Sequence, residues 1–371
     1  MTAPSLQPVS TEAARSRFLA DVRKALPDLR LLEGESDRES YRNDETAYLK
    51  AGLPLAVALP TSTAEVAALV KLAAEHRIPI VPRGAGSGLS GGAAGIEGGL
   101  TIALTKMDAV IEIDRENLVV VTQPGILNAE LKKRVAAEGL FYAPDPASYE
   151  ICSIGGNLGT NAGGLCCVKY GQTRDSVLGL EVVLADGRVI RTGGRYIKNV
   201  AGYALTHLFV GSQGTLGIIT EATLRLRVAP PPRTTMLAFF PTLDGAGDAV
   251  ARIVAAGIDM VTLELLDKAS IAAVDEAFNL GLDRNAEAML LVESDRPESS
   301  SSAAPTAAPT GRRSPPRPFR PSPPTGPGRT TPRPGPWTWP GAWKPVRGGC
   351  GWGRCRPACS CPRTTARAGN W

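Results

Sequence analysis

The sequence predicts an α+β protein with two folded parts and a disordered tail, and three observations lead to this prediction. A strand–helix–strand pattern over residues 55–81 runs directly into a loop rich in glycine. Pro230-Pro231-Pro232 then marks a boundary, after which strands and helices alternate again. From Ser299 onward the composition is that of a chain too poor in apolar residues to build a core.

These observations divide the 371 residues into four predicted segments. They are an N-terminal helical segment (1–50), a first domain (51–230), an incomplete second domain (234–298) and the tail (299–371). In the first segment, Phe18, Val22 and Leu26 recur at helical spacing after Ser10, the candidate N-cap.

The elements of the two domains follow from hydrophobic periodicity and from turn residues. In the first domain we expect strands at 55–60, 78–81, 100–104, 110–113, 118–123, 178–184, 189–192 and 218–228. Helices are expected there at 64–76, capped by Ser62 or Thr63, and at 126–139. In the second domain, strands at 236–240, 260–265 and 288–292 surround helices at 245–256 and 268–278, an alternation typical of ferredoxin-like domains.

The first glycine-rich stretch, residues 82–92, could be a hairpin tip or a phosphate-binding loop. Glycine permits positive φ and close approach of a ligand, and consecutive backbone N–H groups suit phosphate. Gly86-x-Gly88-x-x-Gly91 matches the dinucleotide fingerprint, but no helix is predicted after it, which excludes a Rossmann unit. Residues 154–164 and 211–217 are two further glycine-rich stretches, and a long ligand would need more than one of them.

The charge is distributed unevenly along the chain. All 36 acidic residues precede Ser299, whereas the tail contains 11 Arg, one Lys and no acid. The positive charge of the tail is the only feature that favours nucleic-acid binding, so we expect no nucleic-acid partner. Residues encoded by G- and C-rich codons dominate the tail, and we hypothesise that the reading frame slips near Glu298.

The sequence predicts neither a membrane span nor a metal site. It has no run of 18 apolar residues and no apolar N-terminal region typical of a signal peptide, which favours the cytoplasm with at most peripheral membrane association. The spacing of Cys350, Cys355, Cys359 and Cys361 fits neither zinc knuckles nor iron–sulfur motifs.

The three glycine-rich stretches, in this order and spacing, resemble a flavoprotein family. Its members bind FAD in a two-lobed α+β domain of the PCMH type, the vanillyl-alcohol oxidase fold. Within it the chain is similar to the FAD-linked glycolate oxidase subunits and the D-lactate dehydrogenases. The similar segments are 81–92, 144–148, 154–164, 169–171 and 214–220, within residues 40–298.

The resemblance implies that FAD is bound non-covalently, and it also implies which stretch contacts each part of the cofactor. The first stretch would hold the pyrophosphate, the second would line the flavin, and Gly217 to Ile219 would close over the adenine or ribitol side. The implied cofactor-binding residues are Pro82, Arg83, Gly84, Ala85, Gly86, Ser87, Gly88, Leu89, Ser90, Pro144, Asp145, Ser148, Gly155, Gly156, Asn157, Thr160, Asn161, Gly163, Gly164, Gly217, Ile218 and Ile219.

The resemblance also implies an FAD-dependent oxidoreductase that oxidises a 2-hydroxy acid, glycolate or D-lactate, by hydride transfer to the flavin. The electron acceptor is not implied, and partner subunits with iron–sulfur centres are one candidate. The family's substrate-domain histidines fall where this chain has its tail, so no catalytic residue is assigned, and His76 and His207 are expected to be structural. The alternative is therefore a catalytically dead FAD-binding remnant or subunit.

Overall fold

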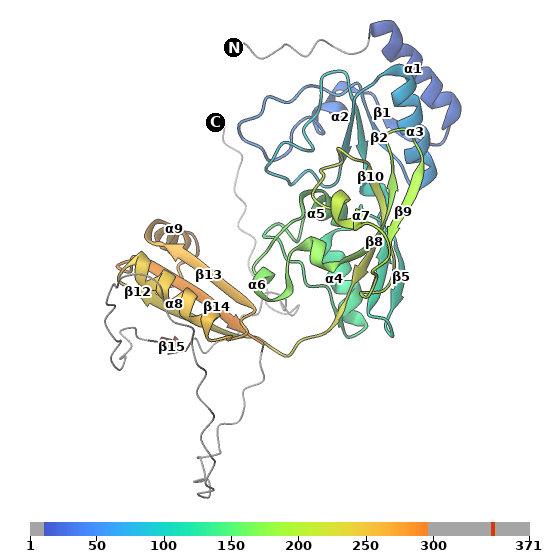
Figure 1. The fold of residues 1–371 in the computed structure, drawn as a ribbon. Helices are drawn as coiled ribbons and strands as arrows, with labels where there is room; N and C mark the ends of the chain where they lie inside the picture. The colour runs from blue at the N-terminus through green and yellow to red at the C-terminus, as the bar shows by residue number, and fades with distance from the viewer. Residues whose placement is uncertain (1–10, 296–342, 346–371) are drawn as a thin grey trace, which may run out of the picture.

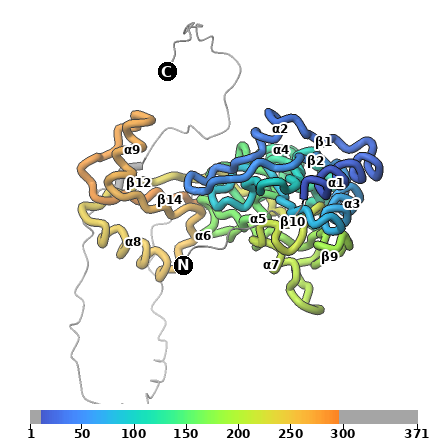
Figure 2. Tube along the Cα trace, turned by 90° about the horizontal axis from the view of Figure 1, so that it is seen from above, coloured from blue at the N-terminus to red at the C-terminus, as the bar shows by residue number. Residues whose placement is uncertain are grey.

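The computed structural model describes residues 11–295 and 343–345 of the chain. The first part contains two large sheets and a two-stranded one, and a C-terminal unit lies beside it on the side of α6 (Cys167–Tyr170) (Figures 1 and 2). The predicted frame slip and nearly all of the predicted disordered tail lie outside the described residues. Of the tail, only β15 (Trp343–Pro345) is described, as a strand where the sequence predicts no secondary structure.

The first sheet has the strand order β1-β2-β4-β3. Its strands are β1 (Arg30–Leu32), β2 (Ala56–Leu59), β3 (Ile80–Arg83) and β4 (Leu100–Ala103), with α2 (Glu35–Glu39) and the short 3₁₀ helix η1 (Leu104–Lys106) nearby. Helices α1 (Glu12–Ala25) and α3 (Thr63–His76) bury their apolar faces against this sheet. Ser62 caps α3 as predicted, whereas Thr11 and not Ser10 caps α1.

The first glycine-rich stretch connects β3 to β4, and these two strands run parallel. A hairpin joins antiparallel strands, so the hairpin interpretation of this stretch is wrong. The stretch instead leaves the carboxyl end of β3 and returns to the start of β4. It therefore lies beyond the carboxyl ends of the strands, where ligands bind in open sheets with parallel strands.

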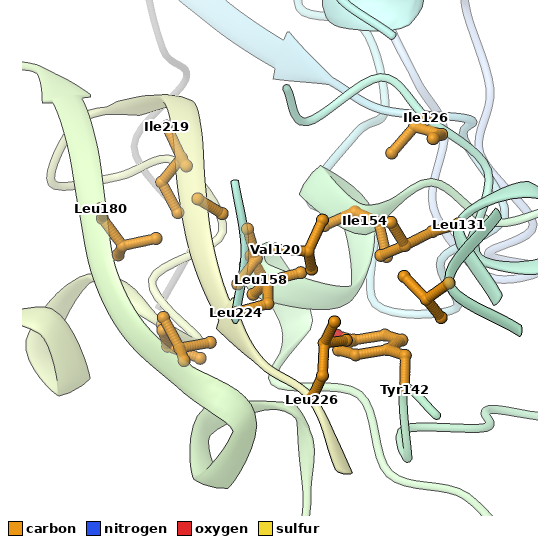
Figure 3. Close-up of a cluster of buried hydrophobic side chains, with 14 of the residues drawn as sticks. Val120, Ile126, Leu131, Tyr142, Ile154, Leu158, Leu180, Ile219, Leu224 and Leu226 are labelled. Atoms are coloured by element: carbon orange, nitrogen blue, oxygen red, sulfur yellow. The ribbon is translucent and has the colours of Figure 1, made fainter. Parts of the chain in front are cut away.

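The second sheet is antiparallel, with the order β5-β6-β10-β8-β9. Its strands are β5 (Val110–Asp114), β6 (Val119–Thr122), β8 (Val177–Val183), β9 (Val189–Gly193) and β10 (Ile218–Arg225). Helices α4 (Asn128–Ala137) and α5 (Ile154–Thr160) pack on one face of it, through Ile154, Leu158 and Leu131 against Val120 and Leu224 (Figure 3). The remaining elements are β7 (Leu140–Phe141), paired with β11 (Arg227–Val228), the 3₁₀ helix η2 (Thr173–Ser176) and α7 (Leu205–Phe209).

The two sheets meet in one cluster of buried residues, and the second sheet has a further cluster of its own. Val183 of β8 and Ile218 of β10 are buried in the same cluster as residues of α1, α3 and the first sheet. Because this cluster joins the sheets, they form the two lobes of a single folded part, as the resemblance implies.

The C-terminal unit is a sheet in the order β13-β14-β12-β15 with two helices. Its described strands are β12 (Thr234–Phe240), β13 (Thr262–Asp267) and β14 (Ala288–Ser294), beside β15. Helix α8 (Leu243–Ala255) packs on one face, and α9 (Lys268–Phe278) packs with the residues of the other face. None of the helices described in the structure is long and apolar enough to cross a membrane.

Candidate functional site

A cavity opens where the three glycine-rich stretches meet. It encloses about 920 Å³ when the solvent-filled space at its open mouth is included. Sixteen of the residues implied by the resemblance line it: Pro82, Arg83, Gly84, Ala85, Gly86, Ser87, Gly88, Ser90, Ser148, Gly155, Gly156, Asn157, Thr160, Gly217, Ile218 and Ile219. Sequence positions more than a hundred residues apart thus share one wall.

Six of the implied residues do not line this cavity: Leu89, Pro144, Asp145, Asn161, Gly163 and Gly164. The Leu89 side chain is exposed to solvent. The Asp145 carboxylate accepts hydrogen bonds from Cys166, at 3.1 Å from its backbone N and 2.8 Å from its Sγ. The Asn161 side chain donates to Gln172 and accepts from the Arg174 backbone. These two polar side chains are used to hold loops beside the cavity.

Ser153 joins the first stretch to the second. Its Oγ accepts hydrogen bonds from the backbone N–H groups of Ala85 at 3.3 Å and Gly156 at 3.2 Å. A Cβ on Gly84 would clash with this oxygen, so Gly84 permits the close approach of the two stretches. No helix was predicted in the second stretch, but residues Ile154–Thr160 of it form the helix α5, which Ser153 caps.

The third stretch closes the cavity. Gln213, at φ 50°, donates its backbone N–H to the Gly159 carbonyl at 2.9 Å, and its side chain lies where a Cβ on Gly92 would be. Gly214 has φ +76°, and a Cβ there would clash with the ring of Pro82. One dipeptide therefore contacts both of the other stretches.

Arg83 is the buried cation of the cavity. Its guanidinium donates to the Ala93 carbonyl at 2.9 Å and lies over the Tyr41 ring, 5.6 Å from the ring centre. Burial lowers the pKa of Arg83, and the nearby Asp44 carboxylate partly offsets this effect. A Cβ on Gly86 would clash with the guanidinium, so Arg83 and Gly86 depend on each other. Arg83 thus braces the first stretch and supplies positive charge to the wall.

The first stretch fits a phosphate-bearing ligand. Within residues 11–295, none of the backbone N–H groups from Gly86 to Ser90 has a hydrogen-bond partner. Consecutive free N–H groups form a concave anion site, and a Cβ on Gly88 would meet only open space. The donors, the absence of side chains and the nearby Arg83 all suit the pyrophosphate of FAD.

Sequence reasoning missed several residues of the site. Asp44, Gly92, Ala93, Leu104, Cys152, Gly159, Ala162, Gln213 and Gly214 also line the cavity. Gln213 and Gly214 belong to a stretch already noted as glycine-rich, which was a usable signal. Asp44 comes from the N-terminal segment, and its local sequence contains nothing that predicts contact with residues near Ala93.

Neither histidine lies at the cavity. His76 on α3 lies 2.8 Å from the Asp21 carboxylate on α1, and His207 is exposed on α7. The titratable side chains in the wall are Asp44, Arg83 and Cys152. The described residues therefore place no imidazole base beside the candidate cofactor site.

Comparison with protein families identifies two matching regions. Residues 54–193 match the FAD binding domain family, and residues 229–307 match the family of FAD linked oxidases, C-terminal domain. The first match contains most of the cavity wall. The second begins at the link to the C-terminal unit.

Individual proteins show the same similarity over part of their length. The glycolate oxidase subunit GlcD of Bacillus subtilis is 46% identical over 265 residues, which are 71% of this chain and 56% of that protein. A D-lactate dehydrogenase of Anaerostipes hadrus is 42% identical over 62% of this chain and 48% of its own length. The chain thus spans about half the length of these relatives. The structure of p-cresol methylhydroxylase with substrate bound superposes with a TM-score of 0.65 at 20% identity, covering 78% of this chain and 62% of that one, which shows a shared fold.

Proposed function

Because this chain belongs to the FAD-binding oxidoreductases of the PCMH type, we propose that it binds FAD in the glycine-lined cavity and that its reaction is the oxidation of a 2-hydroxy acid. The observation that carries the cofactor placement is the run of unpaired N–H groups from Gly86 to Ser90 beside Arg83. The substrate class is supported by the names of two relatives, a glycolate oxidase subunit and a D-lactate dehydrogenase.

FAD, when bound, supplies the group that accepts a hydride. The chain supplies the binding site. The first stretch and Arg83 bind the diphosphate of FAD, and α5 together with Gly217 to Ile219 holds the rest of the cofactor. A 2-hydroxy acid also needs a base for its hydroxyl proton and a cation for its carboxylate. The Arg83 side chain is buried and hydrogen-bonded to the Ala93 carbonyl, so it is a poor candidate for the cation that binds the substrate carboxylate.

A second candidate function is FAD binding without turnover. It is favoured by the position of the two histidines, neither of which is in the cavity wall formed by the described residues. Loss of a general base costs about 10²–10⁴-fold in rate, and loss of substrate orientation costs more. Under this second candidate, the chain binds FAD but oxidises 2-hydroxy acids poorly or not at all.

One experiment separates the two candidates. The full chain, loaded with FAD, is mixed anaerobically with glycolate and, separately, with D-lactate while the flavin absorbance near 450 nm is followed. Rapid bleaching by either acid would establish the oxidase or dehydrogenase function. A stable yellow complex that neither acid bleaches would support the binding function, and a colourless protein would contradict both.

The electron acceptor follows from the same proposal. The Bacillus subtilis relative is named as a subunit, so we propose that reduced flavin passes its electrons to partner subunits. Co-purification of the tagged chain with proteins that show iron–sulfur absorbance would support this assignment. Full reoxidation of the isolated chain by oxygen at the rate of turnover would contradict it.

A further inference from the structure

Asn128, the first residue of α4, is buried in a place where an apolar residue would be expected. It lies on the buried face of α4 together with Leu131 and Val135, and its side chain is completely buried. Its Oδ1 atom has no hydrogen-bond partner among the described residues. An unpaired buried amide oxygen is costly, whereas the Nδ2 amide nitrogen of the same side chain has two acceptors.

The side-chain amide nitrogen of Asn128 is connected to the cavity wall through hydrogen bonds. Its Nδ2 donates to the Pro144 carbonyl at 3.2 Å and to Asn157 Oδ1 at 2.9 Å. Asn157 Nδ2 in turn contacts Cys152 Sγ at 3.1 Å. Asn157 and Cys152 both line the cavity, whereas Asn128 does not.

The orientation of this chain of contacts is fixed at one end. A proline carbonyl can only accept, so Nδ2 and not Oδ1 of Asn128 must face Pro144. The same Nδ2 then requires Oδ1 of Asn157, and this leaves Nδ2 of Asn157 directed at Cys152. The Asn128 backbone adds a second connection, because its N–H donates to the Cys152 carbonyl at 2.9 Å.

We propose that Asn128 is a positioning residue for FAD, which acts by fixing the orientation of the Asn157 carboxamide in the cavity wall. Without Asn128, the amide of Asn157 is free to reverse, and α5 loses its side-chain connection to the Pro144 segment. Asn128 does not touch the cofactor itself. The inference rests on the proposed placement of FAD in this cavity.

The test is a double-mutant cycle on FAD affinity, measured by calorimetric titration of the flavin-free full chain. We expect N128A to raise the dissociation constant for FAD about tenfold, as for the loss of a buried hydrogen bond, and to alter the absorption spectrum of the bound flavin. If Asn128 acts through Asn157, the N128A/N157A variant binds no more weakly than N157A. The matched control is N117A, because Asn117 is an exposed residue that is hydrogen-bonded to Asp114, and neither of the two lines the cavity.

Each outcome decides the inference. Wild-type affinity and an unchanged flavin spectrum in N128A would overturn it, and so would multiplicative effects in the double variant. If circular dichroism shows that N128A does not fold, N128L replaces it in the same cycle, since leucine branches at the same atom, fills the site and carries no donor. Failure of the unaltered chain to bind FAD would instead contradict the cofactor placement, and with it this inference.

Discussion

Lys169 Nζ lies 2.6 Å from Asp295 Oδ1, and this ion pair joins α6 to the end of the C-terminal unit. Lys169 also lies 2.9 Å from Asp259, and the Tyr170 hydroxyl donates to the second oxygen of Asp295. Asp295 is only 5% exposed. The contact is therefore a charged network around one buried carboxylate, between two regions that match different families.

We expect Lys169→Met to destabilise the protein. Asp295 would keep its hydrogen bond from Tyr170 but lose its ion pair with Lys169. Leaving a buried carboxylate without its cationic partner costs about 3 kcal/mol in the free energy of unfolding. Thermal unfolding followed by circular dichroism measures the change. The control is Lys268→Met, whose partner Glu287 is half exposed like Lys268 itself, and this change should cost less than about 1 kcal/mol. Equal shifts for both variants would contradict the role of the network.

The same network predicts a loss of stability in acid. Burial raises the pKa of Asp295, but hydrogen bonds from Lys169 and Tyr170 outweigh it, so the net pKa lies below the ordinary value. Its contribution is present above the unfolded pKa of about 3.9 and is lost as the pH falls through the lower folded value. Between pH 5 and pH 2, the unfolding temperature of the unaltered chain should fall more steeply than that of Lys169→Met. Parallel curves would show that Asp295 does not contribute.

Gly86→Ala and Gly156→Ala should affect the cavity in different ways. At Gly86, φ is +81° and a Cβ clashes with Arg83, so we expect Ala to distort the first stretch and to lower stability by about 1 kcal/mol or more. At Gly156, in α5, the only atom within 4 Å of a Cβ is Ser153 Oγ at 3.3 Å, a tight contact that a small shift of this side chain relieves, so we expect Ala to disturb the fold less than it does at Gly86. Weaker FAD binding in a stable Gly156→Ala protein would then report contact with the cofactor.

The control for both glycine variants is Gly247→Ala in α8, where a Cβ meets nothing within 4 Å. It should leave FAD affinity unchanged and raise helix stability slightly. Unchanged FAD affinity in both cavity variants would contradict the proposed cofactor placement.

Cys166 should be chemically inert in the folded protein. Burial, together with the adjacent Asp145 carboxylate, raises the pKa of the Cys166 thiol to about 12. The reactive thiolate is therefore scarce at pH 8, and iodoacetamide should label Cys166 only after unfolding. Site-resolved mass spectrometry checks this against Cys167, which is partly exposed. Labelling of Cys166 as fast as that of Cys167 would refute the prediction.

Local sequence patterns predicted the regular elements well, because periodicity and capping are local properties. The helix predicted at 268–278 coincides with α9, and most strands were placed within two residues. The short elements β1, β7, α6 and α7 were missed, since they depend on tertiary contacts and not on a periodic pattern. The helix α5 was missed because its glycines disfavour helix, and Ser153 and the surrounding core override that preference.

The site was only partly predictable from the sequence. Glycine-rich stretches are visible in the sequence, and the resemblance assigns each of them to a part of FAD. The local sequence, however, contains no signal that Gln213 packs against Gly92. Asn128 carries no glycine or charge signal, and its importance becomes visible only in its contacts with Pro144 and Asn157. Asp145 was assigned to the cofactor, yet the structure directs its carboxylate to Cys166.

The closing of the cavity by Gln213 and Gly214 has a consequence for biosynthesis. The ribosome makes Pro82 about 130 residues before Gly214, and such long-range contacts form late in folding. A nascent chain that has not yet reached Ile219 lacks one wall of the cavity, and we expect it to release FAD readily. All of the wall residues nevertheless precede Thr234, so cofactor loading can begin before the C-terminal unit has been translated.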